Sequence, residues 1–323
     1  MKQILSHLVD SNNILLASHS NPDGDAVGSL IAMGLALEAI NKKVFLYNDS
    51  PIPAVYRFLS SVERIARRMD ETMQFDTAVI LDCGNLERIG PGLSEVNKVP
   101  VVINIDHHVT NTGFGHYQLI DTLACSTAEI IYRLIKKLAV PIDLSIATSI
   151  YTGILTDTGS FRFSNTNQAA FAICEEMTER GVKPHNVAQH VYGTYSLGRI
   201  KLLNLALESI EISDNGKLSI ITITQDMLAR TGTQPEDIDG MINYARRIED
   251  VSVATLIQEN INGAGNLTNS NHYHVSLRSD GSVDVAAIAA IYGGGGHSTA
   301  AGFGIETTLA ELKAEIKDLA DKL

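Results

Sequence analysis

Short apolar runs alternate with helix-like segments through the first half of the chain, and this alternation limits the possible folds more than any other feature. Four runs have the length and apolar content of buried strands, at residues 14–17, 44–47, 78–81 and 101–105. The segments 26–40 and 53–68 lie between them and have helical periodicity. Strands that alternate with helices form parallel sheets whose two faces are covered. We therefore predict an α/β fold with a parallel β-sheet flanked by helices.

The pattern changes after Ser126. Helical periodicity then dominates, over residues 127–138, 143–156, 168–180 and 186–211. A second alternation predicts strands and helices in turn, with strands at 217–224, 251–258 and 273–278 and helices at 237–247, 284–292 and from 309 onward. The polar segment 260–271 is expected to be a hairpin connection. We predict an N-terminal domain at 1–185, a helical linker at 186–215 and a smaller C-terminal α/β domain at 216–323, with a cleft between the domains.

Charge and composition exclude several classes of protein. The net charge of −12 gives no basic face for a long duplex nucleic acid, although a small anionic substrate remains possible. The longest apolar stretch, residues 30–40, is too short to span a membrane and contains Glu38. Residues 1–13 lack the apolar core of a signal peptide, and the three cysteines form no disulfide framework or zinc motif. We expect a cytoplasmic protein without a membrane partner.

Residue types that bind metals follow three of the predicted strands, and one more acid follows a predicted helix. They are His19, Asp23 and Asp25 after the first run, Asp82 after the third, Asp106, His107 and His108 after the fourth, and Asp157 after the helix. Ligands of open parallel sheets bind at the carboxyl ends of the strands, so these residues can converge. Carboxylates and imidazoles without thiolates suit Mn²⁺ or Mg²⁺ better than structural zinc. Taken alone, Asp25 could equally cap the helix that follows it.

In this order, these residues resemble the four motifs of the DHH phosphoesterase superfamily. The flanking segments SHSNPDGDAVGS, NIDHHVTN and GILTDTGSFRFSN are typical of its branch of bifunctional oligoribonucleases and pAp phosphatases. The C-terminal segment YGGGGHSTAAGF resembles the partner domain called DHHA1. The resemblance covers nearly the whole chain and implies an N-terminal DHH domain followed by a DHHA1 domain.

The resemblance also implies two divalent metal ions, with Mn²⁺ as the first choice and Mg²⁺ or Co²⁺ as alternatives. One ion would be held by His19, Asp23 and Asp82, and the other by Asp25, Asp82, His107 and Asp157. Asp106 would orient a histidine ligand, and His108 would face the scissile phosphate as a cation or proton donor. Two such ions can polarise phosphoryl oxygens and activate a shared water.

The C-terminal glycines are expected to form a phosphate site. They precede a predicted helix start at residues 297–301, and free backbone N–H groups at a helix start bind anions. Arg278 ends a predicted strand. From the residues alone, it could equally be a cation of this phosphate site or a solvated surface arginine. With the resemblance, a pocket for the terminal phosphate or nucleotide end of the substrate is implied, formed by Arg278, Gly295, Gly296, His297 and Ser298. Arg162 and Asn165 are weaker candidates, expected to be structural or rim residues.

The implied function is hydrolysis of short RNA oligonucleotides or linear dinucleotides to mononucleotides, and of 3′-phosphoadenosine 5′-phosphate (pAp) to AMP. A stand-alone cyclic-di-AMP phosphodiesterase uses the same motifs and is the main alternative. A RecJ-like single-strand DNA exonuclease is longer and carries a further nucleic-acid-binding domain. A catalytically inactive nucleotide-binding protein would lack a ligand, and no expected ligand is missing. Monomer and homodimer both remain open.

Overall fold

The computed structural model describes residues 1–70, 72–193, 195–260 and 271–320, and the chain divides into two compact units, Met1–Thr194 and Tyr195–Leu323. The division falls inside the segment predicted as a linker. One continuous helix was expected there, over residues 186–211, but the structure has two, α7 (Pro184–Tyr192) and α8 (Leu197–Glu208). Within these described ranges, no helix is both long and apolar enough to cross a membrane.

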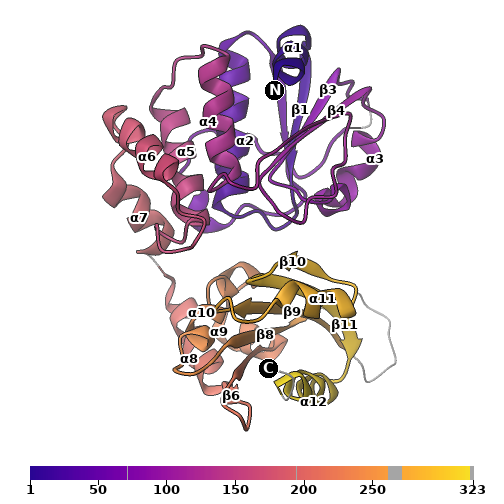
Figure 1. The fold of residues 1–323 in the computed structure, drawn as a ribbon, viewed down its shortest axis with the longest axis vertical. Helices are drawn as coiled ribbons and strands as arrows, with labels where there is room; N and C mark the ends of the chain where they lie inside the picture. Colours follow the sequence, from indigo (N-terminus) through magenta and orange to yellow (C-terminus); the bar gives the residue numbers. More distant parts are fainter. Residues whose placement is uncertain (71, 194, 261–270, 321–323) are drawn as a thin grey trace. The chain divides into compact units, whose positions relative to one another are not determined.

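The first unit contains a sheet of five parallel strands in the order β2-β1-β3-β4-β5. Figure 1 labels three of them, β1, β3 and β4. The strands are β1 (Asn13–Ser18), β2 (Lys43–Tyr47), β3 (Thr77–Leu81), β4 (Val101–Asp106) and β5 (Tyr117–Ile120). The first four coincide with the predicted apolar runs, and β5 is a short edge strand that the sequence did not indicate. The predicted parallel α/β architecture is confirmed.

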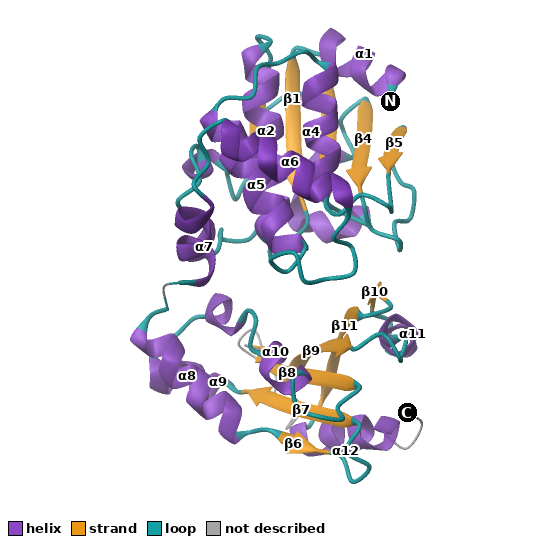
Figure 2. Ribbon diagram, turned by 60° about the vertical axis from the view of Figure 1, so that its left-hand side comes forward, coloured by secondary structure: helices purple, strands orange, loops and turns teal. Residues whose placement is uncertain are grey.

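Both faces of this sheet are covered. Ile14 and Leu16 of β1 pack with the main helices, whereas Leu15 and Ala17 point to the other face. The helices on the first face are α1 (Lys2–Asp10), α2 (Gly24–Ala39), α4 (Thr127–Lys137), α5 (Leu144–Asp157) and α6 (Gln168–Glu179). Figure 2 shows α2 and α4 running alongside β1. The second face is covered by the 3₁₀ segment η3 (Leu86–Gly92) and the short α3 (Leu93–Val96).

The prediction of a helix at residues 53–68 is wrong. Only two 3₁₀ turns form there, η1 (Ala54–Tyr56) and η2 (Val62–Arg64), and Ser61 between them has a left-handed backbone with φ 68°. The buried apolar residues recur every three positions, at Tyr56, Leu59, Val62 and Ile65. A repeat of three fits the 3.0 residues per turn of a 3₁₀ helix better than the 3.6 of an α-helix.

The second unit contains a six-stranded mixed sheet in the order β10-β11-β9-β8-β7-β6, in which only β7 and β8 are parallel. The strands are β6 (Glu211–Ile212), β7 (Leu218–Ile223), β8 (Val253–Asn260), β9 (Asn271–Ser279), β10 (Gly295–His297) and β11 (Ala300–Thr307). One face is covered by α11 (Val285–Ile291) and α12 (Leu309–Ala320). The other is covered by α8, α9 (Gln225–Thr231) and α10 (Ile242–Arg246).

Two predictions for this unit need correction. The expected helix start at residues 297–301 is wrong, because β10 and β11 form an antiparallel hairpin there. The helix expected at 237–247 is broken, since the 3₁₀ segment η4 (Pro235–Ile238) is separated from α10 by Gly240, whose φ is 79°. A hairpin connection was predicted at residues 260–271, and residues 261–270 of it lie outside the described part of the chain. The strands β8 and β9 on either side pair antiparallel.

Candidate metal centre

The carboxyl ends of β1, β3 and β4 meet at one edge of the first sheet because these strands are parallel neighbours. The loops after them carry most of the predicted ligands, and two more come from the start of α2 and the end of α5. The structure therefore brings together all eight residues predicted for this site: His19, Asp23, Asp25, Asp82, Asp106, His107, His108 and Asp157.

Asp23, and not Asp25, caps helix α2. One carboxylate oxygen of Asp23 accepts hydrogen bonds from the backbone N–H groups of Asp25 and Ala26, both at 3.0 Å. Gly24 lies between the two acids at the first position of the helix. A Cβ at Gly24 would lie 2.4 Å from Oγ1 of Thr156, so the glycine allows the end of α5 to approach the start of α2.

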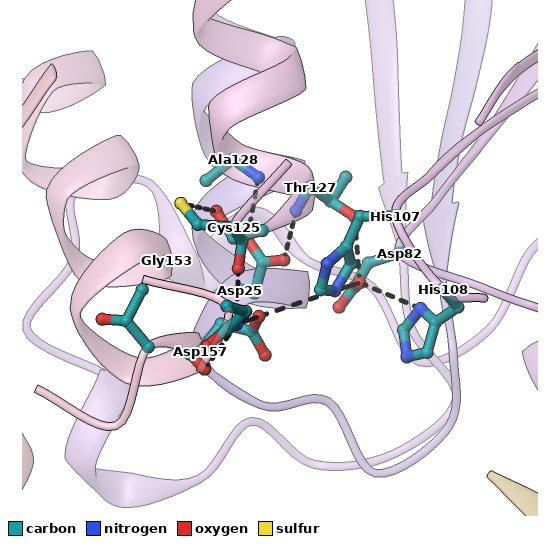
Figure 3. A network of polar contacts seen from close by, with 12 residues as sticks. Asp25, Asp82, His107, His108, Cys125, Thr127, Ala128, Gly153 and Asp157 are labelled. Atoms are coloured by element: carbon teal, nitrogen blue, oxygen red, sulfur yellow. Dashed lines mark hydrogen bonds and ion pairs between the residues drawn. The ribbon is translucent and has the colours of Figure 1, made fainter. Parts of the chain in front are cut away.

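The carboxylate of Asp25 points into the protein and is held by the first turn of α4 (Figure 3). The backbone N–H groups of Thr127 and Ala128 donate to it at 2.6 and 2.8 Å. A helix N-terminus favours an anion, and here the anion is a side chain of the protein. The sequence analysis missed Thr127, whose Oγ1 also donates to Asp82 Oδ1 at 3.0 Å. The capping pattern Ser126-x-x-Glu129 could have indicated this helix start.

Asp82 is the central acid of the site. It follows β3 with a left-handed backbone, φ 54°, which is uncommon for a residue other than glycine. Its two oxygens face three imidazoles, from His19 at 3.6 Å, His107 at 3.8 Å and His108 at 3.7 Å. The Oδ2 atom is buried and, among the described residues, accepts no hydrogen bond. A buried carboxylate oxygen without a donor is expected where a cation binds.

Two histidines present a nitrogen to these carboxylates. Nδ1 of His19 lies 2.8 Å from the carbonyl oxygen of Ser20 and donates to it, and this bond holds the ring with Nε2 directed at Asp82. Nε2 of His107 lies 3.6 Å from Asp157 Oδ2. The side-chain amide of Asn165 donates to the same Asp157 oxygen at 3.0 Å and to the backbone carbonyl of Cys125 at 2.8 Å. Asn165 is thus a positioning residue for Asp157.

Asp106 orients His108. One oxygen of Asp106 lies 2.7 Å from Nδ1 of His108, and the backbone N–H of His107 donates to that oxygen at 2.8 Å. The amide of Asn111, which the sequence analysis did not single out, donates to the other oxygen at 2.6 Å. Burial alone would lower the pKa of His108, but the bond to Asp106 and the charge of Asp82 outweigh burial and raise this pKa to about 9. The bond to Asp106 therefore favours the protonated form of the His108 ring.

The acids of the site cannot all be ionised without added positive charge. Burial, together with the nearby carboxylates, raises the pKa of Asp25 and of Asp157 well above the usual range. Burial also opposes ionisation of Asp82, but the three histidines outweigh it and lower its pKa. Divalent cations would remove the conflict between these carboxylates.

Among the described residues, ligand atoms cluster in three groups, and within each group all lie within 4.8 Å of one another. The groups are His19, Asp23 and Asp82; Asp25, His107 and Asp157; and Asp82, His107 and His108. The first contains the residues expected for one ion, and the second contains three of the four expected for the other, without Asp82. The third group shares Asp82 with the first and His107 with the second. The donor set and the unpaired Asp82 oxygen both fit a pair of hard or borderline divalent ions.

The residues predicted to bind phosphate lie on the second sheet. Arg278 of β9 is opposite Ala300 of β11, and Ala300 is opposite His297 of β10, so Arg278 and His297 lie in one row on the same face. Gly295 is exposed, and a Cβ at Gly296 would lie 2.4 Å from the carbonyl oxygen of Ala300. Ser298 is exposed at the turn of the hairpin. Arg162, in the first unit, is exposed and donates from Nε to the carbonyl oxygen of Gly159 at 2.6 Å.

Comparison with known proteins identifies both units. Residues 13–154 match the N-terminal domain of the DHH family, and residues 217–323 match the DHHA1 domain. The chain is 33% identical over 292 residues to the bifunctional oligoribonuclease and PAP phosphatase NrnA of Thermus thermophilus, and the alignment covers 90% of this chain and 83% of that protein. The chain belongs to the DHH family. This confirms the resemblance found in the sequence, and the protein is a hydrolase of phosphate esters.

Other known proteins are similar over most of the chain. The NrnA protein of Bacillus subtilis is 27% identical over 317 residues, covering 95% of this chain and 96% of that protein. The crystal structure of an exopolyphosphatase-related protein from Bacteroides fragilis superposes with a TM-score of 0.89 at 26% identity, covering 99% and 95% of the two chains. RecJ of Thermus thermophilus shares the fold at a TM-score of 0.56 and 14% identity, and only 54% of that chain is covered.

Proposed function

We propose that this protein hydrolyses short oligoribonucleotides and linear dinucleotides to mononucleotides, and pAp to AMP. The observation that carries the proposal is the set of three overlapping ligand groups, two of which include Asp82, whose buried Oδ2 accepts no hydrogen bond from the described residues. The full-length relatives named as oligoribonucleases and PAP phosphatases support this substrate class. The net charge of −12 also suits a short substrate better than a long nucleic acid. A cytoplasmic location, inferred from the sequence, is part of the proposal.

In the proposed mechanism, His19, Asp23 and Asp82 would hold one divalent ion, and Asp25, Asp82, His107 and Asp157 the other. Mn²⁺ is proposed, because the donors are carboxylates and imidazoles without thiolates, and Mg²⁺ or Co²⁺ could replace it. When bound, the ions would supply Lewis-acid polarisation of the phosphoryl group and an activated water.

His108 has a separate role in this proposal. Its ring is held by Asp106, and this bond favours the protonated form of the imidazole. A protonated imidazole can neutralise charge on the scissile phosphate and donate a proton to the leaving oxygen. Asp106, fixed by the amide of Asn111, keeps the ring in place and favours the charged form.

The second unit would bind the terminal phosphate or nucleotide end of the substrate. Arg278 and His297 share a row on one face of the sheet, and the nearby Gly295 is exposed, with no atom within 4 Å of the place where a Cβ would lie. A guanidinium fork suits phosphate, and glycine permits close approach of an anion to the backbone. This proposal rests on the hairpin geometry, and the helix N-terminus expected from the sequence has no part in it.

The test is a side-by-side turnover assay with Mn²⁺ on pAp, the dinucleotide pApA, a pentaribonucleotide and cyclic-di-AMP. We expect release of AMP from pAp and pApA, and mononucleotides from the pentamer. Asp82→Ala should lower kcat by several orders of magnitude, whereas Asp10→Ala, which changes an exposed acid of α1, should not affect it. Unchanged turnover by Asp82→Ala would contradict the mechanism. Preferential hydrolysis of cyclic-di-AMP would instead favour the cyclic-dinucleotide phosphodiesterase.

A further inference from the structure

Asn48 is a fully buried polar residue directly after β2, beside the loop that carries the first candidate ligand. Because Ala17 of β1 is opposite Tyr47 of β2, Asn48 lies next to Ser18, the last residue of β1. The backbone N–H of Asn48 donates to the carbonyl oxygen of Ala66, which belongs to neither strand, at 3.1 Å. A buried polar side chain needs partners inside the protein, and those of Asn48 lie mainly in the loop after β1.

The side-chain amide of Asn48 joins the loops that follow β1 and β2. Its Nδ2 atom donates to the carbonyl oxygen of His19 and to Oγ of Ser18, both at 2.8 Å. Its Oδ1 atom accepts from the backbone N–H of Ser50 at 3.0 Å. An amide supplies two donors and an acceptor, whereas an ionised aspartate of the same shape supplies only acceptors. An ionised aspartate could therefore not form the two bonds to the loop after β1.

The peptide group between His19 and Ser20 is held from both sides. Its carbonyl oxygen accepts from Asn48, and its N–H donates to the carbonyl oxygen of Arg88 in η3 at 2.6 Å. Because a peptide group is planar, these two bonds fix its orientation. The carbonyl oxygen of Ser20 accepts from Nδ1 of the His19 ring at 2.8 Å, and Nε2 of the ring faces Asp82 at 3.6 Å. The bond from Asn48 thus belongs to a chain of contacts that ends at the nitrogen facing Asp82.

We propose that Asn48 is a positioning residue for His19, and that the affinity of the protein for the ion held by His19 depends on the Asn48 amide. This inference rests on the metal site of the proposed function. A ligand that is fixed before the ion arrives loses less conformational freedom on binding, and residues that orient a histidine ligand contribute to metal affinity. Asn48 acts on the ring through the backbone, whereas Asn165 bonds directly to the carboxylate of Asp157.

The test is a double-mutant cycle in which calorimetric titration measures Mn²⁺ binding to the wild type, Asn48→Asp, His19→Ala and the double variant. Asn48→Asp keeps the shape of the side chain and removes its donors. We expect it to weaken one ion about 10- to 100-fold, the same ion that His19→Ala weakens. In the His19→Ala background it should have little further effect, because the ring that Asn48 positions is gone. Equal losses in the two backgrounds, or no loss in the wild-type background, would overturn the inference.

Thr77→Val is the matched control for a general loss of stability. Thr77 is a buried residue at the start of β3, at the opposite end of the same sheet, and its Oγ1 lies 2.7 Å from Oγ of Ser11. The change keeps the shape and removes a buried hydrogen bond, so Tm should fall while Mn²⁺ affinity stays that of the wild type. If Asn48→Asp does not fold, Asn48→Ala, which buries no charge, takes its place in the cycle. An equal loss of Mn²⁺ affinity in Thr77→Val would disprove the role of Asn48.

Turnover of pAp and pApA separates this inference from the proposed function. Excess Mn²⁺ should restore most of the turnover of Asn48→Asp, because the His19 ring is still present and only its placement has changed. A loss of turnover with unchanged Mn²⁺ affinity would contradict the inference. If the wild type binds two ions and hydrolyses neither substrate, the proposed function fails while the double-mutant cycle still decides the role of Asn48. A wild type that binds no Mn²⁺ would overturn both.

Discussion

Asp157 is an acid whose ionisation opposes folding of the metal-free protein. Its pKa is raised well above the usual range by burial and by the carboxylates of Asp23 and Asp82. The pKa of an aspartate in the unfolded chain is about 3.9. Because the pKa of Asp157 in the folded protein is higher, the folded state loses stability as the pH rises above that value. Below pH 4 the carboxyl group is protonated in both states and has no such effect. We predict that Asp157→Asn, in EDTA, raises Tm at pH 7 and leaves it nearly unchanged at pH 4.

The same variant should lose its response to metal. Wild-type Tm should rise when Mn²⁺ is added, because a ligand that binds only the folded state stabilises it, whereas Asp157→Asn should respond weakly. Asp121→Asn is a control of opposite sign, since the hydrogen bond from Arg133 lowers the pKa of Asp121 and its loss should reduce Tm at pH 7. Thermal denaturation followed by circular dichroism measures each case. If the Tm of metal-free Asp157→Asn at pH 7 were lower than that of the wild type, the repulsion between Asp157 and the neighbouring carboxylates would be refuted.

At the scale of elements, the close approach of α2 and α5 positions two ligands at once. Asp25 lies in the first turn of α2 and Asp157 at the end of α5. A Cβ at Gly28 would lie 2.4 Å from the backbone carbonyl oxygen of Ser149, which cannot move aside as a side chain can. We predict that Gly28→Ala costs about 1–3 kcal/mol of stability and weakens Mn²⁺ binding. Chemical denaturation and calorimetric titration measure the two effects.

Gly34→Ala, on the same helix, is the matched control for this prediction. A Cβ at Gly34 would meet mainly the side chain of Leu46, at 2.9 Å, and a leucine can change rotamer. Its Mn²⁺ affinity should therefore equal that of the wild type. Equal losses of metal affinity in the two variants would show that the packing of α2 against α5 does not position the ligands.

Apolar runs made the three central strands of the first sheet predictable, because both faces of each strand are buried and nearly every residue is apolar. The edge strand β2 is less buried, but residues 44–47 still form an apolar run. β5 is half-buried and has only four residues, so it gave no such run. The hairpin at residues 295–307 was mistaken for a helix start because Ser298 and Thr299 resemble a helix cap. In the structure Ala301 and Phe303 are buried and alternate with less buried residues. This period of two is typical of a strand and not of a helix.

The candidate metal ligands could be picked out for a different reason from the residues that contact them. The candidate ligands have characteristic chemistry and mostly follow strands, whereas Thr127, Asn111 and Asn165 are of types common in loops and helix caps. Their roles come from contacts between distant segments, such as the bond from Thr127 to Asp25, 102 positions away. Sequence spacing carries no information on such contacts.

At the scale of the whole molecule, the two units should contribute separable parts of substrate binding. We predict that Arg278→Ala raises KM by about tenfold or more for substrates with a terminal phosphate, such as pAp and pApA, with little change on bis-p-nitrophenyl phosphate. Arg230→Ala, which removes an exposed arginine of the same unit paired with Asp226, is the control. Steady-state kinetics on the three substrates gives the comparison. An equal loss on the generic ester would show that Arg278 does not recognise that phosphate.

The position of the candidate ligands in the first unit also bears on how such a protein can evolve. They lie at strand ends and helix termini, where contacts with other elements hold them. Arg162 lies on an exposed segment after α5, so its side chain can be replaced while these contacts persist. Exposed positions of this kind can therefore vary among related proteins while the reaction itself is inherited.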